Sequence, residues 1–212
     1  MRYAVLCALM GLLADARAAA PDSPEPVQAI WKDQEFSFFF QSQTTFYSCS
    51  SLEAKLERIL KVLGSRYPDA KVRSIDCQTV PARMPRVTVK FSAPVEATPD
   101  AIAEREKSRS KRELAARVRG ESQDPAALAP FPAQWQRVSL SRGQLGLEPG
   151  DCELIDELRR KVLPRLAVRL VEDGMHCTPH QVAMGQPKLE VDALVALPKP
   201  DDPQKKDESK KK

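Results

Sequence analysis

The sequence contains few of the residues on which enzyme catalysis most often depends. Its 212 residues include 8 glycines and only two histidines, His176 and His180. A nucleophilic Ser or Cys usually needs a nearby His as its base. The sequence also lacks the G-x-S-x-G, H-E-x-x-H, P-loop and dinucleotide-binding motifs. We therefore expect no catalytic residues, no cofactor and a protein that is not an enzyme.

Long hydrophobic runs are also missing, except near the start of the chain. Arg2 precedes an apolar run of about 11 residues, from Tyr3 to Leu13, whereas a bilayer span needs roughly 20. The small residues of Ala16–Ala20 follow and offer A-x-A cleavage sites. These features predict a signal peptide over residues 1–20 and no transmembrane segment after its removal. We expect the protein to be periplasmic or secreted.

The cysteines do not form any C-x-x-C pair, which excludes a thioredoxin-like redox motif and a zinc ribbon. Cys7 lies in the predicted signal peptide and would be removed with it. The remaining cysteines are Cys49, Cys77, Cys152 and Cys177. An even number of cysteines in an exported chain indicates disulfides, and four cysteines allow three pairings.

Two similar segments begin and end at these cysteines, Cys49 to Cys77 and Cys152 to Cys177, which indicates an internal duplication. Apolar residues stand at matching distances from Cys49 and Cys152 and have the spacing of one face of a helix; the matches are Leu52/Ile155, Ile59/Val162, Leu60/Leu163 and Leu63/Leu166. A proline-led strand follows in both segments (Pro85–Val89 and Pro187–Val191), and a strand-like run precedes both (Glu35–Phe40 and Trp135–Ser141). The sequence thus predicts an α+β fold with two tandem β-α-β-β repeats.

We expect the helices of both repeats to pack on one face of a mixed sheet that the repeats share, with two separate small domains as the alternative. The first repeat would span residues 27–97 and the second 134–198, with a charged helical linker over 98–133 and a disordered Lys-rich tail over 199–212. The first repeat's helix should begin at Ser50 or Ser51 and end at Gly64, and the second should begin at Asp151 and break near Pro164.

The predicted topology also favours one pairing of the cysteines. In a strand–helix–strand crossover the two strands are parallel, so their carboxyl ends lie at the same edge of the sheet. Cys49 and Cys77 follow the two strands of the first crossover, and Cys152 and Cys177 those of the second. We predict Cys49–Cys77 and Cys152–Cys177 disulfides, with pairing between the repeats as the alternative.

The positive charge is placed outside the two predicted repeats. The chain has a formal net charge of +4, but the excess of Lys and Arg lies in residues 98–120 and in the tail, leaving the repeats slightly acidic. Nucleic-acid binding needs Lys and Arg clustered on a folded face, so we expect no nucleic-acid partner. The alternative to a purely solubilising role is contact of the linker or tail with anionic lipid, lipopolysaccharide or cell-wall polymer.

Two local features suggest ligands. Aromatic residues concentrate in Phe36–Tyr47, which predicts a strand buried on both faces. The alternative is a partly exposed aromatic face that packs against the second repeat or a partner. His176 and His180, with Met175 and Met184, suit copper, although the matching loop of the first repeat has no histidine. Our main hypothesis is a non-catalytic cell-envelope protein that binds an envelope protein or cell-wall polymer through a strand edge or the loops near the cysteines. The alternative is a periplasmic copper-binding protein.

Overall fold

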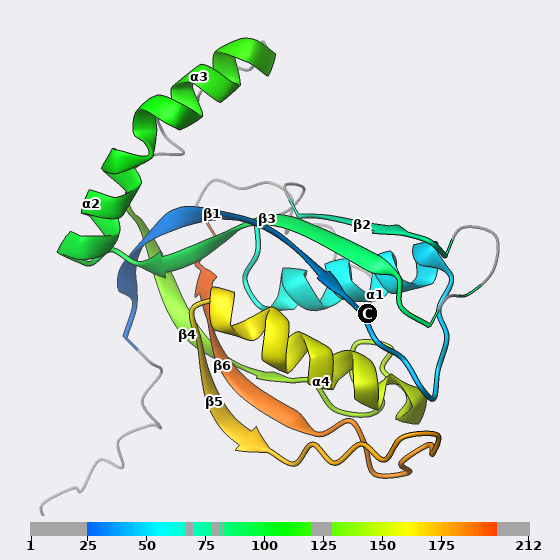
Figure 1. The fold of residues 1–212 in the computed structure, drawn as a ribbon. Coiled ribbons are helices and arrows are strands. Elements are labelled where there is room, and N and C mark those ends of the chain that lie inside the picture. Colours follow the sequence, from blue (N-terminus) through cyan, green and yellow to red (C-terminus); the bar gives the residue numbers. More distant parts are fainter. Residues whose placement is uncertain (1–24, 67–69, 78–80, 82, 120–128, 199–212) are drawn as a thin grey trace, which may run out of the picture.

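The computed structural model describes residues 25–66, 70–77, 81, 83–119 and 129–198. Within these residues, six strands form one antiparallel sheet in the order β2-β3-β1-β4-β6-β5 (Figure 1). The strands are β1 (Val27–Phe39), β2 (Lys71–Ile75), β3 (Arg86–Glu96), β4 (Phe131–Ser139), β5 (Val168–Asp173) and β6 (Leu189–Ala196). The predicted signal peptide and tail lie outside the described residues.

The prediction of a mixed sheet was wrong, whereas the prediction of one shared α+β sheet is confirmed. β1 and β2 do run in the same direction, as a crossover through helix α1 (Cys49–Val62) requires. They are not neighbours, because β3 lies between them and pairs antiparallel with both. β6 takes the corresponding place between β4 and β5. Among the described strands, the first three pair directly with the last three only through β1 and β4, and this pairing is also antiparallel.

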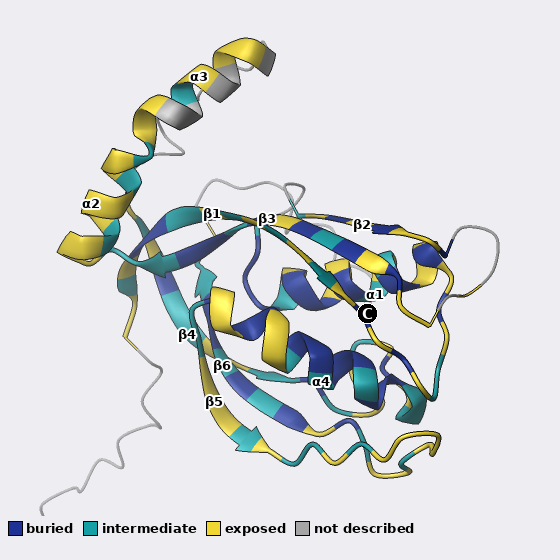
Figure 2. Ribbon diagram, in the orientation of Figure 1, coloured by how far each residue is buried: buried dark blue, intermediate teal, exposed yellow. Residues whose placement is uncertain are grey.

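Two helices cover one face of the sheet and enclose the core. Helix α4 (Cys152–Lys161) lies beside α1 in the concavity of the sheet (Figure 1). Both helices turn a buried apolar stripe toward the strands, as Figure 2 shows. The core is continuous across both halves of the chain; its largest fully buried side chains include Phe40, Phe91, Leu56, Ile59, Leu140, Leu154 and Leu158.

The predicted helix ends are mostly correct, but the predicted start of the first helix, Ser50 or Ser51, was wrong by two or three residues. Ser48 is the N-cap of α1, because its hydroxyl accepts a hydrogen bond from the backbone N–H of Ser51. After α1, Gly64 adopts a φ of 89°, and a Cβ there would collide with the carbonyl oxygen of Leu194 in β6. In the second half, α4 ends at Lys161, and Pro164 lies in a short 3-10 turn, Leu163–Arg165.

β1 differs from the expected strand in its burial and in its path. Phe36 and Phe38 are half-buried on the core side, whereas Ser37 and Phe39 are exposed, so the strand is not buried on both faces. β1 pairs with β4 only through Val27–Ala29. The two strands then bend away from this short antiparallel segment, and their far ends come to the same side of the molecule (Figure 1).

An arm of two helices stands between the two halves of the chain. α2 (Pro99–Lys107) has Thr98 as its N-cap and no buried residue, and α3 (Arg109–Arg119) follows after Ser108. The two helices project away from the body (Figures 1 and 2). The structure therefore places helices in the segment for which the sequence predicts a helical linker.

Candidate functional site: the cysteine edge

Both disulfides lie where the far ends of the two half-sheets meet. They join Cys49 to Cys77 and Cys152 to Cys177, the pairing expected from topology. Cys49 and Cys152 are the first residues of α1 and α4, while Cys77 and Cys177 follow β2 and β5. We call this region the cysteine edge; it comprises the described residues of segments 40–48, 76–85, 140–151 and 174–188.

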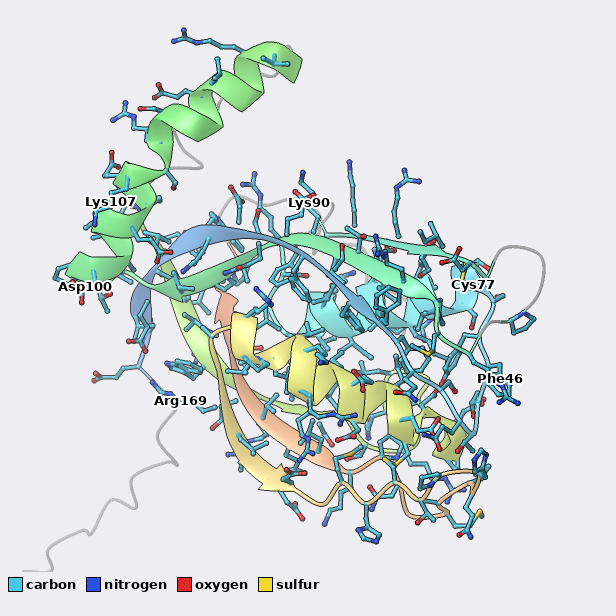
Figure 3. All side chains as sticks on the ribbon, in the orientation of Figure 1. Phe46, Cys77, Lys90, Asp100, Lys107 and Arg169 are labelled. Atoms are coloured by element: carbon cyan, nitrogen blue, oxygen red, sulfur yellow. A yellow bond between two sulfur atoms is a disulfide. The ribbon has the colours of Figure 1, made fainter. Side chains whose placement is uncertain are left out.

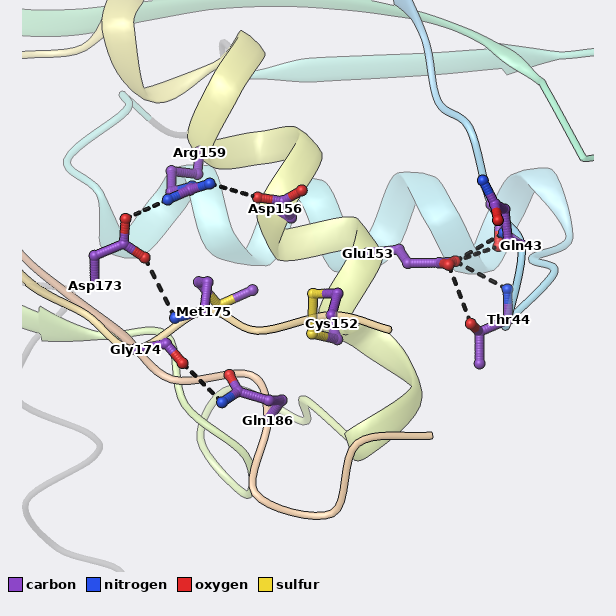
Figure 4. The surroundings of a disulfide bond; sticks show 12 residues. Gln43, Thr44, Cys152, Glu153, Asp156, Arg159, Asp173, Gly174, Met175 and Gln186 are labelled. Atoms are coloured by element: carbon purple, nitrogen blue, oxygen red, sulfur yellow. Dashed lines mark hydrogen bonds and ion pairs between the residues drawn. A yellow bond between two sulfur atoms is a disulfide. The ribbon is translucent and has the colours of Figure 1, made fainter. Parts of the chain in front are cut away.

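The loop after β1, in the first half of the chain, is held by helix α4 of the second half. The carboxylate of Glu153, in the first turn of α4, accepts hydrogen bonds from the backbone N–H groups of Gln43 and Thr44, at 2.8 and 3.0 Å (Figure 4). It also accepts from the hydroxyls of Thr44 and Ser42, at 3.0 and 3.2 Å. Burial by itself would raise the pKa of Glu153, but these four hydrogen bonds outweigh burial and hold it below its usual value.

This lowered pKa predicts an acid-sensitive contact. Because the folded state favours the carboxylate, the stabilisation is present above the ordinary pKa of Glu and is lost as the pH falls through the depressed value. Glu153→Gln should lower the free energy of unfolding by about 1 kcal/mol at neutral pH, since solvent screens this half-buried site. The difference should shrink as the pH falls below the ordinary pKa of Glu, as urea unfolding at several pH values would show.

The matched control is Glu35→Gln, which removes the charge from an exposed ion pair with Lys90. That change should alter the free energy of unfolding by less than about 0.5 kcal/mol at either pH. An equal loss for Glu153→Gln at neutral and acid pH would contradict the role of its ionised carboxylate.

The loop before α4 is held in turn by side chains of α1. Lys55 Nζ lies 2.6 Å from the buried carboxylate of Asp151, which also accepts hydrogen bonds from the Tyr47 hydroxyl and the backbone N–H of Glu148. Arg58 donates to the carbonyl of Leu145 at 2.9 Å. Burial, followed by the hydrogen bond to Asp151 and the charge of that carboxylate, raises the pKa of Tyr47 far above its ordinary value. Each half therefore fixes a loop of the other.

Exposed apolar side chains gather at the cysteine edge and on the strand ends that adjoin it. Within the described residues, eleven large apolar side chains are exposed. Four belong to the cysteine edge, namely Phe46, Met84, Val182 and Met184, and two are the last residues of adjoining strands, Phe39 of β1 and Ile75 of β2. The others lie on the helical arm or the edge strand β5. Phe46 is seen at the same end of the molecule as Cys77 in Figure 3, opposite Asp100 and Lys107.

Two arginines cover aromatic rings within this group. The guanidinium carbon of Arg86 lies 5.0 Å from the ring centre of Phe39, and that of Arg83 lies 5.7 Å from the ring centre of Phe46. Arg86 is the register partner of both Phe39 and Ile75, so these three residues form one row across the outer face of the sheet. We call the set Phe39, Phe46, Ile75, Met84, Arg83 and Arg86 the aromatic–arginine patch.

The predicted copper ligands also lie at the cysteine edge. His176 and His180 are exposed in the segment between β5 and β6, and His180 Nδ1 lies 3.1 Å from the carbonyl oxygen of Gln43. In the described part of the chain, no three His, Cys, Asp or Glu side chains are arranged to hold a metal ion. The contact between His180 and Gln43 therefore joins the two halves of the chain.

Sequence reasoning found only part of this region. The concentration of aromatic residues indicated Phe39 and Phe46, and helix capping indicated Asp151. Nothing in the local pattern indicated Glu153 or Arg83, because their partners are distant in the sequence.

Among the described residues, no helix is both long and apolar enough to cross a bilayer. Comparison of the chain with protein-family models, curated proteins and solved structures found no match.

Proposed function

We propose that this protein is a non-catalytic binding protein of the cell envelope, which holds a partner protein on its aromatic–arginine patch. The observation that carries the proposal is that four large, exposed apolar side chains and two arginines lie on joined segments, with each arginine over a phenylalanine ring. Their exposed fractions lie between 41% and 53%. Exposed apolar clusters of this kind mark interaction sites on folded proteins.

The chemistry of the patch fits a protein surface with apolar and acidic groups. Aromatic residues, Met and Arg are enriched at protein–protein interfaces, and hot spots are often built from them. Arg83 and Arg86 lie over phenylalanine rings and present cations beside an apolar surface. A partner with carboxylates around an apolar centre would pair with both features.

The support beneath the patch favours binding without rearrangement. The Cys49–Cys77 bridge ties the start of α1 to the end of β2, which carries Ile75, and Glu153 fixes the loop that carries Phe46. Backbone hydrogen bonds from Phe40 to Pro85 and from Ser42 to Arg83 join that loop directly to the segment that carries Met84. A surface already held in place loses less conformational entropy on binding.

We also propose that the two halves arose by duplication. In each half a helix follows the first strand, the third strand lies between the other two, and a disulfide joins the start of the helix to a residue just after the second strand. The exchange of loop contacts between the halves supports the same origin, because α1 holds the loop before α4 and α4 holds the loop before α1.

Export to the periplasm or cell exterior is part of this proposal. It is supported by the apolar run and small residues at the start of the sequence. Two disulfides also suit an oxidising compartment.

The test is selective capture from an envelope extract, followed by binding of the purified partner. We expect the wild-type protein to retain a partner that Phe46→Ser/Met84→Ser binds at least tenfold more weakly, as expected for loss of interface hot-spot residues. Titration of the purified partner against both proteins gives the two affinities.

Leu170→Ser/Val171→Ser is the matched control, because it also removes two exposed apolar side chains but on β5. This variant should bind the partner as the wild type does. Equal weakening by both double variants, or a partner whose affinity the patch variant leaves unchanged, would contradict the proposal. Urea unfolding should confirm that both variants keep wild-type stability.

A further inference from the structure

The connection that carries the helical arm is much longer than the fold requires. Glu96 at the end of β3 and Phe131 at the start of β4 are both register partners of Ala29 in β1. Two strand spacings separate their backbones, roughly 10 Å, a gap that about four extended residues would span. Instead residues 97–130 make the connection, whereas connections of two to six residues are the commonest.

The arm adds little to the core. α2 has no buried residue, and an exposed ion pair between Glu104 and Lys32, at 2.8 Å, ties it to β1. A pocket of about 270 Å³ remains between α2 and the strands; its lining includes Ile30, Trp31 and Ala101. α3 lies beyond α2, and its Leu114 and Val118 are 64% and 80% exposed. The length of the arm therefore calls for an explanation other than core packing.

The charge of the arm is concentrated in α3. That helix contains five Lys or Arg residues and one Glu, a net charge of +4, whereas α2 has a net charge of −1. Arg109 is engaged by Glu113 of its own helix at 2.8 Å. Leu114 and Val118 are four residues apart and so lie on the same face of the helix. α3 is thus a short basic helix with exposed apolar residues on one face.

We propose that α3 docks this protein on the surface of an anionic phospholipid bilayer. Basic amphipathic helices bind at bilayer interfaces through attraction between Lys or Arg and lipid phosphates and through shallow insertion of apolar side chains. The net charge of +4 complements the anionic lipids, and the exposed pair Leu114 and Val118 favours a bilayer over a hydrophilic polyanion. The arm lies at the opposite end from Phe46 (Figure 3), so a docked molecule would keep its patch accessible.

Vesicle flotation of the full chain tests this proposal, with phosphatidylcholine vesicles that contain or lack phosphatidylglycerol. Wild-type protein should bind only the anionic vesicles, and salt should weaken the binding. Arg117→Glu/Arg119→Glu should bind at least about thirtyfold more weakly, since each cation near an anionic membrane contributes about a factor of five and the two new carboxylates add repulsion. Leu114→Ala/Val118→Ala should bind about tenfold more weakly; alanine keeps the helix propensity high.

The control is Lys71→Glu/Arg73→Glu, which makes the same change of net charge on the exposed side of β2. All variants retain residues 199–212, so the Lys-rich tail contributes equally to each. Equal losses in the α3 and β2 charge variants would show attraction by overall charge and overturn the proposal. Binding to polyphosphate that is insensitive to Leu114→Ala/Val118→Ala, without binding to vesicles, would also overturn it.

Discussion

Removal of both disulfides should lower the free energy of unfolding by about 7 kcal/mol. The bridges close loops with sequence separations of 28 and 25, and the loss of chain entropy in the unfolded state amounts to about 3.5 kcal/mol for each. The bridges lie in different halves, so their contributions should be approximately additive. Because net stabilities of domains are typically 5–15 kcal/mol, a protein without either bridge should be partly or wholly unfolded at room temperature.

Urea unfolding followed by circular dichroism checks this expectation. Cys49→Ala/Cys77→Ala and Cys152→Ala/Cys177→Ala should each shift the wild-type midpoint to lower urea, and the combination should shift it furthest. Reductant should destabilise the wild-type protein but leave the fourfold variant unchanged, which separates loss of the bridges from other effects of the reductant. An unchanged midpoint of the wild type after verified reduction would show that the bridges do not stabilise this fold.

The elements of this fold could be predicted because their signals are local. The stripe Leu52, Leu56, Ile59 and Leu60 defines a helix whatever it packs against, and Gly64 and Pro164 end helices through their own backbone chemistry. The choice of strand neighbours is not local. No local feature of residues 71–96 indicates that β3 lies between β1 and β2. This placement of β3 makes the sheet antiparallel.

Pro94 shows how sheet context changes the effect of a strand breaker. Proline is rare inside a paired strand, yet β3 continues past it to Glu96. The backbone carbonyl of Ser92 accepts a hydrogen bond from the backbone N–H of Arg66, on the side of β3 that faces β2. Pro94 is two residues further along β3, so its backbone faces the same side. β2 pairs only with residues 86–90 of β3, so the proline nitrogen faces a side with no paired strand. A proline there removes no ladder hydrogen bond.

The candidate site was less predictable than the fold, because its geometry depends on the bending of two strands. β1 and β4 are antiparallel where they pair, so a flat sheet would send their far ends in opposite directions. Their curvature brings Gln43 to Glu153 and Tyr47 to Asp151, more than 100 residues apart in the sequence. The sequence indicated this end of the molecule only through local features, namely the aromatic residues of the first strand and its following loop, the paired cysteines and the two histidines.

Asp151→Ala should lower the free energy of unfolding by about 3–4 kcal/mol. The carboxylate is only 2% exposed, and its loss leaves the Lys55 ammonium, itself 18% exposed, without its ion-pair partner. Breaking one side of a buried pair is costly because the remaining charge stays desolvated. The Tyr47 hydroxyl and the backbone N–H of Glu148 lose their acceptor as well.

Asp156→Ala is the matched control, since it removes the same side chain from α4 but from a more exposed pair with Arg159, at 2.8 Å. That change should cost no more than about 1 kcal/mol. In a double-mutant cycle, Lys55→Met should lessen the effect of Asp151→Ala, because no buried cation then remains to be left unpaired. If Asp151→Ala cost no more than Asp156→Ala, the Lys55–Asp151 pair could not be a strong contact between the two halves at the cysteine edge. Loss of the pair should also loosen the loop that carries Phe46, because Tyr47 is its neighbour in the chain.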